Sequence, residues 1–358
     1  MFIILAISTP FLKSQEKSTF APSLVDKLRQ TLLSISLEEA TFAKRGFQET
    51  NAKTQQHLET IGKTFLQGYQ TAIAFNDPSG VIAQINQIEA EYRGFAFEGA
   101  AMGLALLDRL TPWNSRRIEQ YLIDEGQNHI YMTYVGIGWL LARLPGGIQS
   151  YLTELEKAQV RSLGNWDICP TSPHSLTPSH PHSLLGWLSI DGYGFHQGYF
   201  HWRDYIQGIK PPKNLSGYSC RVFDQGLGRS LWFVKGADLN AIQQAIAQFQ
   251  PHRRADLWSG IGLACGYAGG MENHAIASLK EAAKPYYPEL AQGVAFAAKT
   301  RIRAGNLTEH TEIAAQILCG MSAQQAADIT DDTLTGLSYG ETVPVYEQWR
   351  QGIQKHFI

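Results

Sequence analysis

The sequence predicts an all-α fold, an internally duplicated helical repeat or bundle of stacked helix pairs that forms one compact domain. Three observations on the 358-residue chain support this prediction. Apolar residues recur at steps of three and four over most of its length, which is the spacing of one helix face. No sustained alternation of Val, Ile and Thr indicates a strand. Short glycine motifs return in a fixed order, as in repeat architectures, whose neighbouring units share a core.

Helical periodicity accounts for most of the chain in order. An amphipathic helix opens at Leu24, and its apolar positions continue to Ile35. Further helices are expected over residues 57–75, 81–92, 96–110, 118–122 and 130–144, through 184–280 with internal breaks, over 305–328, and after Pro344. Residues 76–80 and 145–147 are rich in Asn, Asp, Pro and Gly, which favour turns and helix ends, so they are predicted to separate helices.

The recurring motifs define two copies and the start of a third. The paired segments are 65–69 with 195–199, 93–99 with 221–226, and 136–138 with 260–262, and a third copy starts at 292–296. The resulting division is a leader and N-terminal helix at 1–45, a first copy at 46–160, an insertion loop rich in Pro and His at 161–183, a second copy at 184–280, and a partial third copy with C-terminal helices at 281–358. We expect a pseudo-twofold or a solenoid-like step to relate the copies.

Composition narrows the class of protein. The formal net charge of -2 argues against nucleic-acid binding, which needs clustered Lys and Arg. Charged residues are scarce at 17% and aromatic residues reach 11%, so an apolar interior that holds an apolar ligand is expected. Cys169, Cys220, Cys265 and Cys319 lie far apart without a CxxC pair, which predicts reduced thiols in a cytoplasmic protein. The histidines of the insertion loop have no Asp or Glu directly beside them in the sequence, so no metal site is predicted.

The repeated glycines are predicted to bring helix backbones close together. Glycine inside a helix costs about 1 kcal/mol relative to alanine, so its recurrence needs a packing reason. Polar residues directly precede several of these glycines within apolar stretches: Gln67, Glu98, Gln197, Gln225 and Gln292. A buried amide or carboxylate must find hydrogen bonds. These residues either bond one helix to the next or converge on a central cavity.

The second copy carries ionisable residues where the first copy is apolar. His196 and Asp224 stand at the positions of Leu66 and Phe97. His196 is a candidate general acid–base that Asp191 or Asp224 would orient. The candidate catalytic residues are Glu98, Asp191, His196 and Asp224, and the candidate substrate-binding residues are Gln197, Gln225, Arg229, Asp256 and Trp258. A buried Asp–Arg pair is also common as a purely structural ion pair.

Five strings of this sequence resemble the DUF1702 family. They are residues 91–102, 134–145, 191–200, 224–229 and 254–260, and the likeness extends from about Gly46 to about Gly305. That family is associated with enediyne-type polyketide pathways, where its members occur beside an iterative polyketide synthase. The resemblance implies a protein that helps to process a linear polyene into a more unsaturated core. It carries over no catalytic residues and leaves any cofactor unspecified.

Three functions are therefore open. The first is an enzyme, or an obligatory component of one, that acts on a long apolar polyketide chain. The second is a scaffold or accessory subunit that docks other pathway proteins, including a membrane subunit; it predicts internally paired polar groups, no cavity and an exposed apolar patch. The third is a cyclase with an aromatic-lined helical cavity. All three are expected in the cytoplasm, with any membrane association made through a partner.

Overall fold

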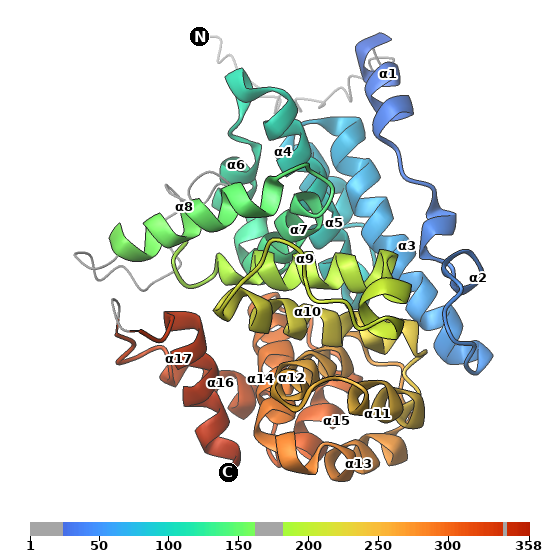
Figure 1. The fold of residues 1–358 in the computed structure, drawn as a ribbon. Helices are drawn as coiled ribbons and strands as arrows, with labels where there is room; N and C mark the ends of the chain where they lie inside the picture. The colour runs from blue at the N-terminus through green and yellow to red at the C-terminus, as the bar shows by residue number, and fades with distance from the viewer. Residues whose placement is uncertain (1–23, 162–181, 339–341) are drawn as a thin grey trace, which may run out of the picture.

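Helices account for all the regular structure that is described (Figure 1). The computed structural model describes residues 24–161, 182–338 and 342–358, and no strand occurs in these ranges. The predicted all-α class is therefore confirmed. The leader up to residue 23 and most of the insertion loop predicted at 161–183 lie outside the described residues. In the described part of the chain, no helix is both long and apolar enough to cross a membrane.

Within the described ranges, seven long helices form a series in which each packs mainly on the next. They are α3 (Ala52–Phe75), α5 (Ala90–Leu110), α7 (Ile130–Leu141), α9 (Trp187–Phe200), α10 (Tyr218–Val234), α12 (Pro251–Ala268) and α14 (Tyr287–Arg303). In Figure 1 the series runs from the blue helices above to the orange helices below. Contacts between sequence neighbours are also typical of repeat architectures.

The other helices of the described ranges connect and flank this series. They are α1 (Leu24–Leu33), α2 (Phe42–Arg45), α4 (Pro78–Ile85), α6 (Arg117–Ile123), α8 (Gly147–Arg161), α11 (Leu239–Ala247), α13 (Asn273–Ala282), α15 (Glu309–Leu318), α16 (Ala323–Asp332) and α17 (Val345–Gln354). The single-turn elements are η1 (Leu37–Ala40), η2 (Pro112–Asn114), η3 (Glu125–His129), η6 (Arg203–Gln207), η7 (Lys284–Tyr286) and η8 (Lys355–Phe357).

The turn predicted at residues 76–80 shows how sequence sets a helix boundary. Asn76 ends α3 in the left-handed conformation, with φ of 56°, which Asn tolerates better than most residues. Asp77 then caps α4 by accepting a hydrogen bond from the Gly80 N–H, and Pro78 occupies the first turn, where its missing N–H is no loss.

Glycines set the distance between consecutive long helices. The first glycine of each motif faces the previous helix, and a Cβ added there would lie 1.8–2.2 Å from one of its carbonyl oxygens. These contacts are Gly99 on Phe65, Gly136 on Glu98, Gly192 on Val135, Gly226 on Asp191, Gly260 on Gln225 and Gly293 on Ser259. No side chain fits at such a distance, so the predicted role of these glycines in close helix packing is confirmed.

The second glycine of each motif faces the following helix in the same way. Here an added Cβ would lie 1.9–2.2 Å from a carbonyl oxygen. The contacts are Gly68 on Ala96, Gly138 on Ser189, Gly194 on Phe223, Gly228 on Leu257 and Gly262 on Leu290. In the helices that carry both glycines, the two lie two residues apart and point to different sides, so such a helix is held between its neighbours at a fixed register.

The repeat seen in these contacts is finer than the two copies predicted from the sequence. The motifs start at residues 66, 99, 136, 192, 226, 260 and 293, one in each long helix, with Leu66 in place of the first glycine and Ala101 and Ala295 in place of the second. The pairing of 93–99 with 221–226 and of 136–138 with 260–262 keeps this register. The pairing of 65–69 with 195–199 does not, because Gly194, not Gly198, makes the contact equivalent to that of Gly68. A duplication of the two halves stays a prediction.

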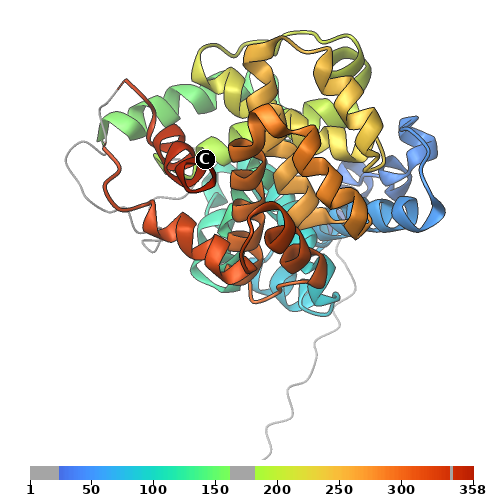
Figure 2. The ribbon, with the colours of Figure 1, turned by 90° about the horizontal axis from the view of Figure 1, so that it is seen from below.

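The series closes on itself where the last helices return to the first. Arg301 of α14 donates a hydrogen bond to the Glu91 carbonyl oxygen at 2.6 Å, and Asn306 donates one to Ala90 at 3.1 Å. Thr54 of α3 donates to the Gly270 carbonyl oxygen after α12 at 2.8 Å. Figure 2 shows the orange helices beside the blue and cyan ones in the view from below. The long helices thus surround a common interior.

The glycine contacts predict a large penalty for one added methyl group. We expect Gly226→Ala to lower the free energy of unfolding by about 3 kcal/mol or more, because its Cβ would lie 1.9 Å from the Asp191 carbonyl oxygen and helices α9 and α10 would have to separate. Gly80→Ala is the control: its Cβ meets only the ends of the Asp77 and Phe75 side chains at 3.2 Å, and the change is expected to stay within about 0.5 kcal/mol. Urea unfolding measures both, and equal effects would contradict the helix-spacing role.

Candidate functional site

The inner side of each long helix follows from the glycine register. In each helix, one residue directly precedes the motif and another stands three residues after its first position. These two residues are four apart, so both project from the same helix face. The residues before the motifs are Phe65, Glu98, Val135, Asp191, Gln225, Ser259 and Gln292, and those three after the starts are Tyr69, Met102, Trp139, Phe195, Arg229, Leu263 and Phe296. All are buried except Leu263, which is half-buried.

Two small cavities lie along this inner side. Cavity A is bounded by α7, α9, α10, α12, α14 and α17, and cavity B by η1, α3, α5, α7, α9 and α10. They hold about 30 and 40 Å³ of space for the centre of a water-sized molecule. Since one water needs roughly 10–15 Å³ on this measure, each admits a few waters or a slender chain.

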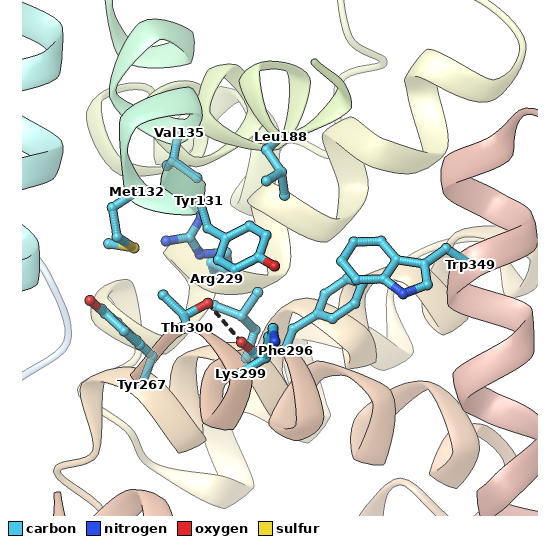
Figure 3. Close-up of a pocket in the computed structure, with 11 residues that line it drawn as sticks. Tyr131, Met132, Val135, Leu188, Arg229, Tyr267, Phe296, Lys299, Thr300 and Trp349 are labelled. Atoms are coloured by element: carbon cyan, nitrogen blue, oxygen red, sulfur yellow. Dashed lines mark hydrogen bonds between the residues drawn. The ribbon is translucent and has the colours of Figure 1, made fainter. Parts of the chain in front are cut away.

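Cavity A has mixed walls, which Figure 3 shows. Its lining includes Tyr131, Val135, Arg229, Tyr267, Lys299 and Trp349. The Arg229 guanidinium reaches in from α10 toward the α7 side, and Trp349 closes the cavity from α17. Cavity B is lined mostly by aromatic rings, and its accessible surface is apolar, although Glu98 is among the residues that line it.

One layer of side chains separates the two cavities. Phe95 on the wall of cavity B packs edge-on against Tyr267 of cavity A, with ring centroids 5.0 Å apart. The Arg229 guanidinium of cavity A lies over the ring of Phe195 of cavity B, 4.6 Å from its centroid. Glu98 and Arg229 therefore lie on the two sides of the same partition.

A buried polar cluster of Glu98, Asp191, Gln225 and Arg229 lies within this partition. Asp191 is fully buried, forms an ion pair with Arg229, and accepts a hydrogen bond from Gln225 Nε2 at 2.9 Å. The same Gln225 nitrogen donates to the Tyr346 hydroxyl of α17 at 3.0 Å. Burial alone lowers the pKa of Arg229, but Asp191 and Glu98 outweigh it and raise the pKa above its ordinary value, so Arg229 stays charged.

Glu98 is the least compensated member of the cluster. Among the described residues, no group forms a hydrogen bond with its Oε1 atom. Burial raises the pKa of Glu98 from its ordinary value of 4.5 to about 7; Arg229 opposes the rise and Asp191 adds to it. A carboxyl group with a pKa near neutrality can both donate and accept a proton, which suits general acid–base chemistry.

Tyr267 belongs to the site and was missed from the sequence. Its hydroxyl is buried without a hydrogen-bond partner among the described residues and lies against Gly94, where an added Cβ would come within 2.0 Å of it. Burial raises the pKa of Tyr267 to about 12, so it remains a neutral donor. Its position in the sequence could have identified it. Tyr267 is seven residues after Gly260, which starts the motif of α12, and this places it on the same helix face as Ser259 and Leu263.

His196 and Asp224 do not join this cluster. His196 is five residues beyond Asp191, so it points to another side of α9 and lies between the rings of Trp139 and Phe200. Its Nδ1 has no hydrogen-bond partner among the described residues, and burial with Arg143 nearby holds its pKa well below the ordinary value. Asp224 instead pairs with Arg253. The predicted orientation of His196 by Asp191 or Asp224 is thus wrong; a catalytic role for His196 itself stays a prediction.

Asp224 is held in a separate ion pair near the surface of α10. Arg253 donates to it through Nε at 2.8 Å and through a second nitrogen. Burial raises the pKa of Asp224 to about 6, although Arg253 opposes the rise. The pairing accounts for a buried carboxylate without any reference to a ligand, which is the structural alternative that the sequence left open.

Asp256 lies in a third group of charges, which docks α17. It accepts hydrogen bonds from Arg221 at 3.0 and 3.2 Å and lies 2.8 Å from Arg350 of α17. Glu347 of α17 pairs with the same two arginines. Of the other candidate binding residues, Trp258 is buried in the core of α12 and Gln197 is half-buried on α9; neither lines cavity A or B.

No metal centre is evident in the described ranges. Among the described residues, no group of three or more His, Cys, Asp and Glu is placed to hold a metal ion. The histidines of the insertion loop fall outside the described residues, apart from His182. That residue accepts hydrogen bonds from the backbone N–H groups of Leu184 and Leu185, which leads the chain into α9.

Fold and site together define an all-α protein in which glycine-spaced helices surround a buried carboxylate and guanidinium pair. A family model described as "Protein of unknown function (DUF1702)" matches residues 24–357, nearly the whole chain. The chain belongs to the DUF1702 family, as the likeness of its motifs indicated. None of the curated proteins and none of the solved structures matches it.

The raised pKa of Glu98 predicts a specific pH dependence of stability. Between pH 4.5 and about 7 the unfolded chain releases this proton while the folded protein retains it, so stability falls as the pH rises through this window. We expect Glu98→Gln to remove the decline. The variant should be more stable than the parent near pH 8, by on the order of 3 kcal/mol, and should differ little near pH 4. Urea unfolding at the two pH values measures this.

The matched control for this prediction is Glu281→Gln. The Glu281 side chain is 76% exposed, so its neutralisation should change stability little at either pH. A Glu98→Gln effect of the same size at both pH values would show that Glu98 does not titrate in this range.

Proposed function

We propose that the protein is an enzyme, or an obligatory component of one, in enediyne-type polyketide biosynthesis, and that it acts on a long apolar polyene. Family membership supports the pathway through the association described above. The observation that supports the chemistry is Glu98, a buried carboxyl beside an aromatic cavity, with a pKa of about 7 and an Oε1 atom to which no described residue forms a hydrogen bond. We expect the protein to work in the cytoplasm, with any membrane contact made through a partner.

In the proposed step, protonated Glu98 gives its proton to one carbon of the polyene and takes a proton back from another carbon. The double bonds move along the chain, and substrate and product are isomers, so the step needs no oxidant or reductant. A positive charge develops on the chain between the two transfers. The rings of Phe95, Trp139 and Phe195 around cavity B suit such a charge, because aromatic faces attract cations.

The other members of the cluster set the conditions for this transfer. Arg229 is neutralised by Asp191, so little net positive charge opposes a cationic intermediate. Gln225 fixes Asp191 from the other side. Tyr267, which stays protonated, can donate a hydrogen bond toward the Glu98 side of the partition. Ring closure of the same cation would make the protein a cyclase, and the aromatic lining of cavity B favours this variant of the proposal.

A docking role is the second candidate, and a surface feature favours it. Trp113 is 82% exposed on η2, and Leu110 and Ile123 at the ends of the neighbouring helices are about half exposed. Beside them a surface hollow of about 660 Å³ opens between α5, α7 and α8. Large exposed apolar side chains of this kind are typical of interaction sites. Such a surface is compatible with an enzyme that works beside pathway partners.

The proposal predicts different effects for the two candidate acid–base residues. Removing a general acid typically lowers a rate by roughly 10²–10⁴-fold. We therefore expect Glu98→Gln to reduce formation of the pathway product by at least about 100-fold, with the parent activity falling as the pH rises through about 7. His196→Gln, checked to be folded, should retain most of the activity. Product formation in a host that lacks the native gene, measured by mass spectrometry, tests both. A fully active Glu98→Gln variant would refute the proposed chemistry.

A further inference from the structure

Basic side chains gather where helices α2, α7 and α9 end. Arg45 is the last residue of α2, Arg143 follows the end of α7, and His201 stands at the C-terminal cap of α9. We call this group the basic patch and define it as Lys44, Arg45, Arg143, His196, His201 and Arg203. Arg143, His201 and Arg203 are exposed, so a solute can reach the patch.

Contacts around Phe200 hold one side of the basic patch together. The Arg45 guanidinium lies over the Phe200 ring, 4.8 Å from its centroid. The His196 ring packs against the same ring, with the two centroids 4.7 Å apart. Arg203 lies beside Gly46, the residue after Arg45, where an added Cβ would come within 2.9 Å of a guanidinium nitrogen. The two arginines therefore lie on the α2 side of His196.

Arg143 and His201 complete the basic patch on the other side of His196. The centroids of the His201 and His196 rings are 6.2 Å apart. Arg143 is four residues after Trp139, whose ring meets the His196 ring edge-on at 5.5 Å. Burial, together with the cations around it, holds the pKa of His196 well below its ordinary value. The centre of the patch is thus a neutral imidazole with cations around it.

The basic patch carries more positive charge than its paired carboxylate balances. Glu39 is shared by Arg45 and Lys44 in ion pairs. Among the described residues, neither Arg143 nor Arg203 forms an ion pair. The four Lys and Arg side chains of the patch therefore share one carboxylate, and the excess charge attracts anions.

Helix ends and a neighbouring carboxylate offset only part of this charge. The C-terminus of a helix carries about half a negative elementary charge, so three helix ends favour some basic residues here without any ligand. Asp204 lies near His201 but pairs with Lys210 at 2.6 Å. Neither feature accounts for His196, which is 4% exposed and whose Nδ1 has no hydrogen-bond partner among the described residues. A bound anion would supply the missing acceptor.

We infer that the basic patch binds the phosphate group of a soluble molecule, with His196 at its base, Arg143 on one side and Arg203 on the other. Guanidinium groups match phosphate oxygens in pairs, and a doubly charged anion uses the cations that one carboxylate leaves over. The exposed side chains of the patch are charged and not apolar, which favours a ligand in solution over a lipid layer. Trp139 and Phe200 also line cavity B, so the bound group lies outside one wall of that cavity.

Calorimetric titration of the full chain with sodium pyrophosphate tests the site. Saturable binding is expected at low ionic strength, and it should weaken as NaCl is added, because salt screens exposed charges. Arg143→Gln and Arg203→Gln should each weaken binding roughly tenfold, since each removes a charge-assisted hydrogen bond to the anion. Arg109→Gln is the matched control: this arginine is also exposed near the end of a helix, α5, but it lies outside the basic patch.

The histidine signals in NMR spectra locate the bound anion. Pyrophosphate should shift the ring Cε1–H signals of His196 and His201 with the same Kd that calorimetry gives. The signal of His274, which is exposed on α13, should stay in place. His196→Gln and His201→Gln assign the signals by removing them. Circular dichroism confirms that each variant is folded.

Several outcomes would overturn this inference. One is an absence of saturable pyrophosphate binding in the parent, and another is equal weakening by Arg109→Gln and Arg143→Gln. Saturable binding that leaves the His196 signal unchanged would place the anion elsewhere. Binding to vesicles that contain phosphatidate, without binding of pyrophosphate, would refute a soluble ligand. None of these measurements depends on the proton transfer proposed above, so the two proposals can fail separately.

Discussion

Backbone contact between consecutive helices, made possible by one glycine facing each way, is the constraint on which the rest of the structure depends. A carbonyl oxygen occupies the space where a side chain would begin at each of these glycines. The rotation and height of each long helix are therefore fixed relative to the helices next to it in the series. In each helix, the residue before the motif and the residue three after its start must then face the interior, whether they are apolar, polar or charged. The site is a product of this register, since Glu98, Asp191, Gln225 and Arg229 all occupy inward positions.

The four polar side chains buried on this inner face differ in how well their lost hydration is compensated. Asp191 and Arg229 offset each other's loss of hydration through an ion pair, and Gln225 completes the bonding of Asp191. For Glu98, the effect of burial outweighs the opposing effects of Arg229 and Trp139, so the low polarity around it favours its neutral form. The same desolvation that would be a defect in a structural carboxylate is what gives Glu98 a proton to exchange near neutral pH.

Much of the fold and part of the site could be predicted from the sequence. Helical periodicity and the glycine motifs indicated the all-α class and close helix packing, and the polar residues before the glycines included Glu98 and Gln225. Asp191 was a candidate for a different reason, as a partner of His196. The position of His196 could not be predicted, because a comparison offset by one helical turn aligned Gly68 with Gly198. Pairings such as Asp224 with Arg253, and the arrival of α17 beside Gln225, depend on tertiary contacts that no local pattern encodes.

The closure of the series has a mechanical consequence. Between α3 and α14 each helix interlocks with the next through backbone contacts, but α14 is joined to the start of α5 by side chains, mainly Arg301 and Asn306 reaching carbonyl oxygens. Such bonds break one at a time, whereas an interlocked pair must part along its length. The ring thus has a seam, and thermal breathing should start there, parting α14 from α5 while the glycine-spaced pairs stay whole.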